Sequence, residues 1–245
     1  MDDNKLTAEC MEQIEIQEQR KEDARLQIVA GHIHRGVEFT DWKHAYIDTT
    51  VTIGRGTKIG PGVILEGDTS IGENCIIGQN CRICDSVIGD GTEVQSSVIV
   101  QSRVGKETKI GPFAYLRPNS TVGDHAKVGD FVEIKNSTLG DGAKASHLTY
   151  IGDSDVGCDV NLGCGVVFVN YDGTSKHRST VKDGAFIGCN TNLISPVSVG
   201  ENAYVAAGTT LTKDVPDGAL AVARARQTNL EGWVEKRGLL KKHKK

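Results

Sequence analysis

Long apolar runs are missing from this chain. The N-terminus, M-D-D-N-K-L-T-A-E, lacks the apolar core of a signal peptide, and no later segment approaches the roughly 20 apolar residues of a membrane-spanning helix. With 245 residues, 38% of them hydrophobic, the chain still has enough apolar material for a sizeable core. We therefore expect a folded, soluble, cytoplasmic protein that does not act at a membrane.

An excess of positive charge is also missing. The formal net charge is -4, the pI is near 6.0, and the only basic run is the tail from Lys236 to Lys245. Nucleic acids and anionic membranes attract basic surfaces, so a mildly acidic protein suits neither of them. Neither is expected as a main partner.

The cysteines do not form an even set, because the chain has seven. An odd number fits poorly with a closed disulfide framework and agrees with a reducing compartment. Cys81 and Cys84 have the C-x-x-C spacing of metal and redox sites, but no second pair of this kind accompanies them. Their places in the repeat described below explain both residues, and no metal is expected.

Strong helix formers occupy residues 4–30, which contain no glycine or proline. They predict one helix, or two with a break, ended by Gly31 and Gly36 and followed by an irregular crossover. Residues 1–46 are therefore predicted to be an N-terminal helical linker and crossover.

A period of six residues begins at Ile47. Aliphatic residues recur at every sixth position, with a few five-residue steps, and a glycine directly follows many of them. A helix would give a spacing of three to four and a half-buried strand a spacing of two, so this period indicates coils of short strands. The first aliphatic positions are Ile47, Ile53, Ile59, Leu65, Ile71, Ile77 and Ile83.

Three six-residue units close one triangular coil of about 18 residues, with the aliphatic side chains inside and glycine permitting the corner backbone. Residues 47–216 are thus predicted to form an all-β parallel helix of about nine coils. Residues 217–245 are expected to form a C-terminal arm and basic tail. Small residues four places after the aliphatic one should fill the corners: Thr57, Cys75, Cys81, Thr108, Ala114, Ala126, Val132 and Ala143.

The repeat has one long interruption, between Phe168 and Val181. The distance is too great for one six-residue step, so a loop leaves the coil here. Loops on rigid scaffolds commonly carry function. This one holds Asn170, Tyr171 and Lys176.

Residues at the same offset on successive coils should stack in columns. Arg117 and Lys135 each follow an aliphatic residue by one position and lie one coil apart. Two cations should therefore meet at one corner, either as solvated surface charges or as a clamp for a phosphate.

A second column is predicted at another corner. His147, Cys164, Cys189 and Ala207 each lie two positions after an aliphatic residue on successive coils. A lone histidine is more often structural than catalytic, but the small residues beside this one favour a general base next to a long, thin ligand. The corners are roughly 15 to 20 Å apart, so we expect the site to be completed between subunits of a threefold homotrimer.

Several segments resemble one family. They are A-Y-L-R-P (114–118), F-V-E-I-K-N-S (131–137), S-H-L-T-Y-I-G-D (146–153), V-N-L-G-C-G (160–165), V-N-Y-D-G (169–173) and A-A-G-T-T-L-T-K-D-V-P (206–216). Over roughly residues 24–240 the chain is similar to the acetyltransferase domain of bacterial bifunctional N-acetylglucosamine-1-phosphate uridyltransferase. The resemblance implies a left-handed parallel β-helix. The nucleotidyltransferase domain of that family is absent, so no uridylyl transfer is expected.

The resemblance also implies a reaction and a set of roles. The reaction is acetylation of glucosamine 1-phosphate by acetyl-CoA without a metal, leading to UDP-N-acetylglucosamine and cell-wall precursors, with His147 as the catalytic base. The implied sugar-phosphate contacts are Arg117, Lys135, Tyr150, Asn161 and Lys176. The implied acetyl-CoA contacts are Cys164, Asn170, Tyr171, Cys189, Ala207 and Arg224. Other members have alanine or serine where this chain has Cys164 and Cys189, which would weaken a serine-specific hydrogen bond.

Direct attack of the sugar amine on the thioester develops an oxyanion, which needs fixed hydrogen-bond donors. The backbone N–H near Cys164 and the Asn170 amide are candidates. Two alternatives stay open: an acetyltransferase for another sugar or amine on the same fold, and a non-catalytic trimeric scaffold. A γ-type carbonic anhydrase would need an H-x-x-x-x-H pair, which this chain lacks.

Overall fold

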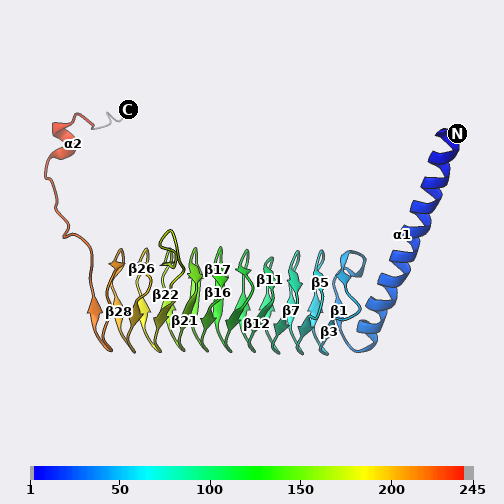
Figure 1. Ribbon diagram of the computed structural model, residues 1–245, viewed down its shortest axis with the longest axis horizontal. Helices are drawn as coiled ribbons and strands as arrows, with labels where there is room; N and C mark the ends of the chain where they lie inside the picture. Colours follow the sequence, from blue (N-terminus) through cyan, green and yellow to red (C-terminus); the bar gives the residue numbers. More distant parts are fainter. Residues whose placement is uncertain (1–2, 240–245) are drawn as a thin grey trace, which may run out of the picture.

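The chain folds into a triangular β-helix with a long helix projecting from its N-terminal end (Figure 1). The computed structural model describes residues 3–239. Short strands of successive coils pair in parallel and form three sheets, named A, B and C in the order in which each coil passes through them. The sheets have 11, 10 and 9 strands and make about ten coils.

From β1 to β29, every third strand along the chain belongs to the same sheet. Sheet A contains β1 (Glu38–Phe39), β4 (Lys58–Ile59), β7 (Ile76–Ile77), β10 (Glu93–Val94), β13 (Lys109–Ile110), β16 (Lys127–Asp130), β19 (Lys144–His147), β22 (Asn161–Leu162), β25 (Phe186–Ile187), β28 (Tyr204–Val205) and β30 (Leu220–Ala221). Sheet B contains β2 (Tyr46–Ile47), β5 (Ile64–Glu66), β8 (Arg82–Cys84), β11 (Val98–Val100), β14 (Tyr115–Leu116), β17 (Glu133–Lys135), β20 (Tyr150–Gly152), β23 (Val167–Val169), β26 (Asn192–Ile194) and β29 (Thr210–Leu211). Sheet C contains β3 (Thr52–Ile53), β6 (Ser70–Ile71), β9 (Val87–Ile88), β12 (Ser102–Val104), β15 (Ser120–Val122), β18 (Thr138–Leu139), β21 (Ser154–Val156), β24 (Ser179–Val181) and β27 (Ser198–Val199).

The predicted β-helix is confirmed, with one more coil than the period suggested. β1 pairs with β4 although it precedes residue 47, and β30 pairs with β28 although it follows residue 216. A short 3-10 helix, η1 (Trp42–His44), lengthens the step between Phe39 and Ile47. This longer step hides the first strand from a search for six-residue spacing.

The aliphatic side chains fill the inside of the triangle. Ile59, Leu65 and Ile77 are fully buried, and burial of each such side chain contributes about 1.5–3 kcal/mol. The predicted small corner residues are buried as well: Thr57, Cys75, Cys81, Thr108, Ala114, Ala126, Val132 and Ala143. The Cys81 thiol donates to the carbonyl of Val94, which agrees with a packing role.

The glycines that follow the aliphatic residues have a different role from the one predicted. Gly54 does not adopt a left-handed backbone conformation. A Cβ atom added there would lie only 2.5 Å from the backbone of Gly72 on the next coil. Close approach between coils therefore requires glycine here. The left-handed corner positions lie two residues further along, for example at Gly56 with φ +77°.

The N-terminal segment is a single helix, α1 (Asp3–His34). Gly31 lies inside the helix, contrary to the prediction that it would help to end it, whereas Gly36, with φ 90°, follows its end. Val29 is buried and Ile28 packs against the core, but Met11 is 52% exposed because the rest of the helix points away from the β-helix (Figure 1). No helix within residues 3–239 is long and apolar enough to cross a membrane.

The C-terminal arm leaves the opposite end of the β-helix (Figure 1). After β30 the chain runs without regular structure to a short helix, α2 (Trp233–Lys236). The last residues of the predicted basic tail, 240–245, lie outside the described residues.

Candidate active site

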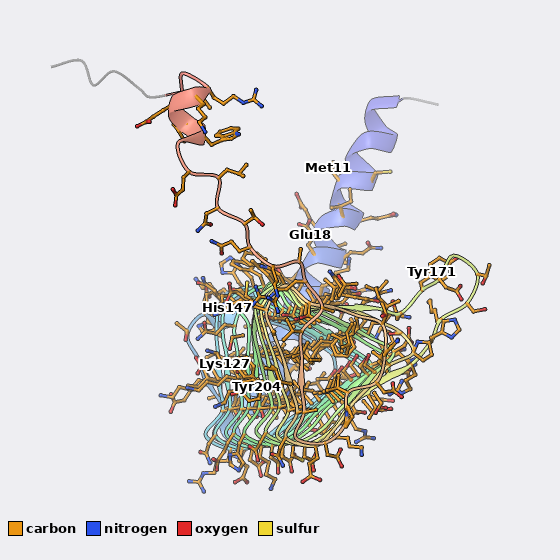
Figure 2. The ribbon with its side chains drawn as sticks, turned by 90° about the vertical axis from the view of Figure 1, so that its left-hand side faces the viewer. Met11, Glu18, Lys127, His147, Tyr171 and Tyr204 are labelled. Carbon is orange, nitrogen blue, oxygen red and sulfur yellow. The ribbon has the colours of Figure 1, made fainter. Side chains whose placement is uncertain are left out.

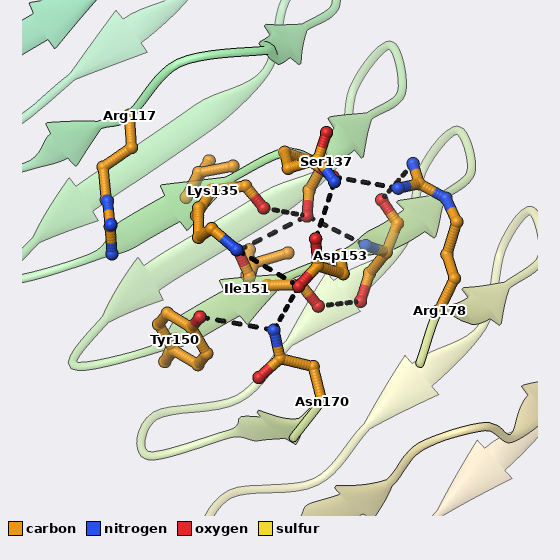
Figure 3. A network of polar contacts seen from close by, with 12 residues as sticks. Arg117, Lys135, Ser137, Tyr150, Ile151, Asp153, Asn170 and Arg178 are labelled. Atoms are coloured by element: carbon orange, nitrogen blue, oxygen red, sulfur yellow. Dashed lines mark hydrogen bonds and ion pairs between the residues drawn. The ribbon is translucent and has the colours of Figure 1, made fainter. Parts of the chain in front are cut away.

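Lys135 and Asp153 form the centre of a polar network at the turn between sheets B and C, called here the B–C corner (Figure 3). Lys135 ends β17, Asp153 follows β20 on the next coil, and Lys135 Nζ lies 3.3 Å from Asp153 Oδ2. Asn136 Nδ2 donates to Asp153 Oδ1 at 2.6 Å, and Asn170 Nδ2 donates to Asp153 Oδ2. The Lys135 and Asp153 side chains are only 18% and 10% exposed. Asp153 therefore holds the Lys135 ammonium at a fixed place on the corner.

Two more cations reach the same corner. Arg117 stacks on Lys135, as predicted, because β14 pairs in register with β17. Arg117 Nη1 also donates to Glu133 Oε1 at 2.8 Å. The pKa of Lys176 is lowered, first by the adjacent Lys135 side chain and further by the positive charge of Arg117. The corner thus concentrates positive charge, and the neighbouring cations disfavour the charged form of Lys176.

Tyr150 and Asn170 complete this corner. Asn170 Nδ2 donates to Tyr150 Oη at 3.5 Å, in addition to its bond with Asp153. Arg117, Lys135, Tyr150 and Lys176, four of the five residues expected to hold the sugar phosphate, are therefore brought together. Asn170 was expected beside acetyl-CoA, yet within one chain it lies in this network (Figure 3).

Asn161 is the fifth expected contact to the sugar phosphate, and it lies elsewhere. It begins β22 on the outer face of sheet A, paired with Lys144 on one side and Phe186 on the other. The chain therefore does not bring Asn161 to the B–C corner. Any contact with a substrate held there would need a second subunit.

The predicted loop is present between β23 and β24, and its own hydrogen bonds give it a defined shape. Asp172 Oδ1 accepts from the backbone N–H groups of Thr174 and Ser175, both at 2.7 Å, and Asp172 Oδ2 pairs with His177 Nε2 at 2.7 Å. These contacts lower the pKa of Asp172 far below its usual range, first through the Ser175 N–H. Tyr171, which is 55% exposed, and Lys176 form an isolated antiparallel β-bridge across the loop. This backbone pairing positions Lys176 near the corner.

The second predicted column lies at the turn between sheets A and B, called here the A–B corner. β19, β22, β25 and β28 are neighbours in sheet A and pair in register, so the residues two places after their aliphatic positions stack. These residues are His147, Cys164, Cys189 and Ala207. The coils approach closely here, because a Cβ atom added at Gly188 would lie 2.4 Å from the backbone nitrogen of Ala207.

His147 has a carboxylate partner one coil before it. Asp130 is in register with His147, and its Oδ1 lies 2.5 Å from His147 Nδ1. The hydrogen bond from His147 is the main reason why the pKa of Asp130 is lowered. An ionised carboxylate only accepts, so Nδ1 carries a proton and donates a hydrogen bond to Asp130, and in the neutral form of the ring Nε2 is the proton acceptor. The His147 side chain is 54% exposed and accessible to a ligand.

Arg224 lies at the far end of the same column. The segment that follows β30 passes beside the last coil, where Thr210 N–H donates to the carbonyl of Ala223 at 3.3 Å. The Arg224 Cδ atom would be 3.8 Å from a Cβ atom added at Gly208, the residue after Ala207. The A–B corner therefore carries a titratable group at one end, small residues along its length, and a cation at the other end.

Within one chain these two groups of residues stay apart. Figure 2, which looks along the β-helix, shows His147 at one corner of the triangle and Tyr171 on the loop beyond another corner. His147 ends a strand of sheet A, whereas Lys135 ends a strand of sheet B. The predicted separation of the columns is thus confirmed by their places in the sheets.

Asp130 and Asp153 were not recognised from the sequence. Asp130 is in register with His147 one coil before it, and Asp153 contacts Lys135 from the next coil. Extending the His147 column by one coil leads to Asp130, whereas the residue in register with Lys135 is Gly152 and Asp153 lies one position beyond it. The period predicts which residues stack, but not which of them form hydrogen bonds.

Two family models match parts of the chain. Residues 42–116 match the GMPPB C-terminal domain, and residues 101–136 and 178–213 match the bacterial transferase hexapeptide (six repeats). The chain is also 64% identical to the bifunctional protein GlmU of Alkaliphilus oremlandii, over 89% of this chain and 48% of that protein. For GlmU of Clostridioides difficile the identity is 56%, over 89% and 47%. The chain is a hexapeptide-repeat β-helix similar to GlmU.

The chain spans about half the length of the curated GlmU relatives that it matches. Solved structures agree with the hexapeptide-repeat fold. The UDP-N-acetylglucosamine acyltransferase of Francisella novicida is 18% identical, with a TM-score of 0.53 over 80% of this chain and 72% of that one. The Arabidopsis UDP-N-acetylglucosamine acyltransferase gives 18% and 0.50, over 80% and 76%. At this identity the likeness shows a shared fold, the left-handed parallel β-helix.

Proposed function

We propose that this chain transfers the acetyl group of acetyl-CoA to the amine of glucosamine 1-phosphate. The observation that carries the proposal is the meeting of Arg117, Lys135 and Lys176 at one corner, which supplies the charge that a sugar phosphate requires. The motifs around these residues resemble the acetyltransferase domain of N-acetylglucosamine-1-phosphate uridyltransferase. The name of the relatives, bifunctional protein GlmU, agrees with that resemblance.

The B–C corner would hold the phosphate group. Lys135 is fixed by Asp153, and Arg117 presents a planar guanidinium that suits two phosphate oxygens. A bound phosphate would also offset the repulsion among these cations, which lowers the pKa of Lys176. Tyr150, beside them, is proposed to contact the sugar.

His147 would be the general base at the A–B corner. Asp130 holds its ring with Nε2 free to accept a proton. The sugar amine attacks the thioester carbonyl carbon, Nε2 takes the proton that the nitrogen loses, and the C–S bond breaks to release the coenzyme thiolate. The proposed reaction uses no metal. Within residues 3–239, no three side chains of His, Cys, Asp or Glu are grouped so that they could hold a metal ion.

The column of Cys164, Cys189 and Ala207 would carry the acetyl donor. Its side chains are small and project little from the corner. Arg224 at its end offers a cation for the coenzyme phosphates. The Cys164 N–H makes no hydrogen bond among the described residues, so it is available to the oxyanion. The Asn170 amide of the same chain is already used at the other corner, and it would serve only at a neighbour's site.

A homotrimer with sites between subunits would join the two corners. An exposed apolar ridge beside His147 supports such a contact, because Phe113, Phe131 and Leu148 are 58%, 57% and 57% exposed. The two phenyl rings stack with their centroids 5.4 Å apart. All three residues have left-handed backbones, with φ of 60°, 56° and 49°, which bulky side chains rarely adopt. Exposed apolar groups of this kind commonly mark a contact surface.

The test is acetyl transfer from acetyl-CoA, followed by mass spectrometry of the product. Released thiol is a poor readout, because Cys10 and Cys189 are exposed and react with thiol reagents. Wild-type protein should acetylate glucosamine 1-phosphate and should be much slower with glucosamine, which lacks the phosphate. His147→Ala should lower turnover by about 10² or more. Near-normal turnover of this variant would remove His147 from the role of base.

His125→Ala is the matched control. His125 is an exposed histidine whose Nδ1 lies 3.2 Å from Glu107 Oε2 on the preceding coil, so it copies the His147–Asp130 pair away from the proposed site. Its turnover should equal that of the wild type. Equal rates with and without the sugar phosphate group would favour another amine as substrate, and no transfer to any amino sugar would favour the scaffold alternative.

A further inference from the structure

Two free cysteines occupy the same place on neighbouring coils at the A–B corner. Cys164 and Cys189 each lie two residues after positions that pair in register, Leu162 and Ile187. The Asn190 N–H donates to the Cys164 carbonyl at 2.8 Å, which ties the two turns together. Each cysteine is followed by a residue with a left-handed backbone, φ 75° at position 165 and 55° at position 190. The two turns thus have the same shape, and the thiols leave them side by side.

The spacing of the coils is compatible with a bond between these thiols. Neighbouring strands lie about 4.8 Å apart, inside the range of about 4.4–6.8 Å between the Cα atoms of disulfides. Parallel side chains keep the Cβ atoms at a similar spacing, more than the roughly 3.8 Å of a relaxed disulfide. Closing the bond therefore needs a small shift of the two turns. A disulfide formed this way is easily reduced, which is typical of regulatory rather than structural disulfides.

The environment of this pair differs from that of the buried cysteines. The Cys75 and Cys81 thiols are fully buried and donate to backbone carbonyls. Cys164 is half-buried and Cys189 is exposed, and within residues 3–239 neither thiol donates a hydrogen bond. The next coil has Ala207 at this place, so packing does not require sulfur. Two adjacent, accessible thiols therefore remain without a structural task.

We infer that Cys164 and Cys189 form a redox-sensitive dithiol, which a small-molecule disulfide oxidises to a disulfide within the chain. The Cys189 thiolate, the more exposed one, attacks one sulfur of R–S–S–R and releases the first R–SH. The Cys164 thiolate then attacks Cys189 Sγ in the mixed disulfide and releases the second R–SH. The two cysteines lose two protons and two electrons, and the small disulfide gains both.

The consequence for activity rests on the proposed function. The dithiol lies between His147 and Arg224 on the column proposed for acetyl-CoA. A surface that is accessible to that coenzyme is also accessible to a small disulfide. Either the mixed disulfide or the closed bond alters the surface on which the donor would lie, so oxidation should slow acetyl transfer and reduction should restore it. Bound acetyl-CoA should protect both thiols.

The experiment treats the full chain with glutathione disulfide at several ratios of oxidised to reduced glutathione. Remaining thiols are then blocked with N-ethylmaleimide, and the peptides are mapped by mass spectrometry. The expected result is one linked peptide pair, Cys164 with Cys189, lighter by two hydrogens than the reduced pair. In Cys189→Ser the reaction should stop at a glutathione adduct on Cys164. Cys10→Ser, which removes an exposed but isolated cysteine, should leave the linked pair unchanged.

The outcomes distinguish a failure of the proposed dithiol from a failure of the proposed acetyl transfer. Two separate glutathione adducts, or free thiols at 164 and 189 while Cys10 is modified, would overturn the dithiol. A linked pair in a protein that transfers no acetyl group when reduced would support the dithiol and sink the proposed function. With activity present, closure should lower turnover by about tenfold, which corresponds to about 1.4 kcal/mol. An unchanged rate in the closed form would overturn the regulatory consequence.

Discussion

Replacing Asp153 with asparagine probes the B–C corner directly. The new side chain keeps the shape of aspartate and tolerates the left-handed backbone, with φ 48°, at this position. Lys135 Nζ and Asn170 Nδ2 both donate toward the native carboxylate. The Nδ2 group of the new asparagine therefore finds no hydrogen-bond acceptor in either of them. Asp153→Asn thus leaves Lys135 charged, largely shielded from water and without its carboxylate partner.

The expected loss of stability follows from how far the pair is shielded. Removing one partner of a buried ion pair costs about 3–5 kcal/mol. Because the Lys135 side chain is 18% exposed and can turn toward water, we expect the lower end, about 3 kcal/mol. The matched control is Asp155→Asn, which breaks an ion pair with Arg178 whose side chains are 49% and 43% exposed. It should cost about 1 kcal/mol or less.

The loss should depend on pH. Burial acts to raise the pKa of Asp153, but hydrogen bonds from Asn136, Asn170 and Lys135 outweigh it, so the pKa is lowered in the fold. A lowered carboxyl pKa gives stability that is complete above the unfolded value of about 3.9 and is lost as the pH falls through the folded value. The difference between wild type and Asp153→Asn should therefore be full at neutral pH and shrink below about pH 4.

Urea unfolding at one fixed protein concentration measures this difference, since association changes apparent stability. Long repeat arrays do not always unfold in one step, so hydrogen exchange of the β20 and β23 amides should accompany it. Faster exchange confined to these strands in Asp153→Asn would support the argument. Equal losses in Asp153→Asn and Asp155→Asn, both near 1 kcal/mol, would refute it.

Further results are expected at the A–B corner. Refolding equal amounts of His147→Ala and Arg117→Ala together should restore about one quarter of wild-type turnover, because one neighbouring pair in four supplies both intact residues; no recovery would contradict a shared site. Gly188→Ala should lower the melting temperature, since its Cβ would lie 2.4 Å from the Ala207 backbone nitrogen, and an unchanged value would contradict that close approach. Asp130→Ala should lower kcat more than Asp130→Asn does, because asparagine can still accept the His147 hydrogen bond; equal rates would show that this orientation is not needed.

The columns were predictable because parallel, in-register coils turn sequence spacing into position. Arg117 with Lys135, and His147 with Cys164, stack as their offsets require. Contacts that depend on side-chain partners were not predictable in this way, and Asp153 is the clearest case. Its three hydrogen bonds join two coils and a loop, and the loop has no period from which to place Asn170.

The ends of the β-helix were less predictable for a different reason. β1 and β30 pair with their neighbours through the backbone, which does not need the six-residue pattern of aliphatic side chains. The role of the glycines was also hidden. Spacing shows that glycine recurs at Gly54, but only the distance to the next coil shows why a larger residue is excluded.

The loop after β23 is an insertion that does not shift the stacked columns. The neighbouring-coil hydrogen bond from Asp124 N–H to Asp141 spans 17 residues, whereas the equivalent bond from Cys158 N–H to Asp183 spans 25. The pairing on both sides of the loop is nevertheless in register. A corner can therefore gain or lose residues while every stacked column keeps its order. Such a scaffold allows substrate preference to change by the length and composition of corner loops, independently of the surface that holds the donor.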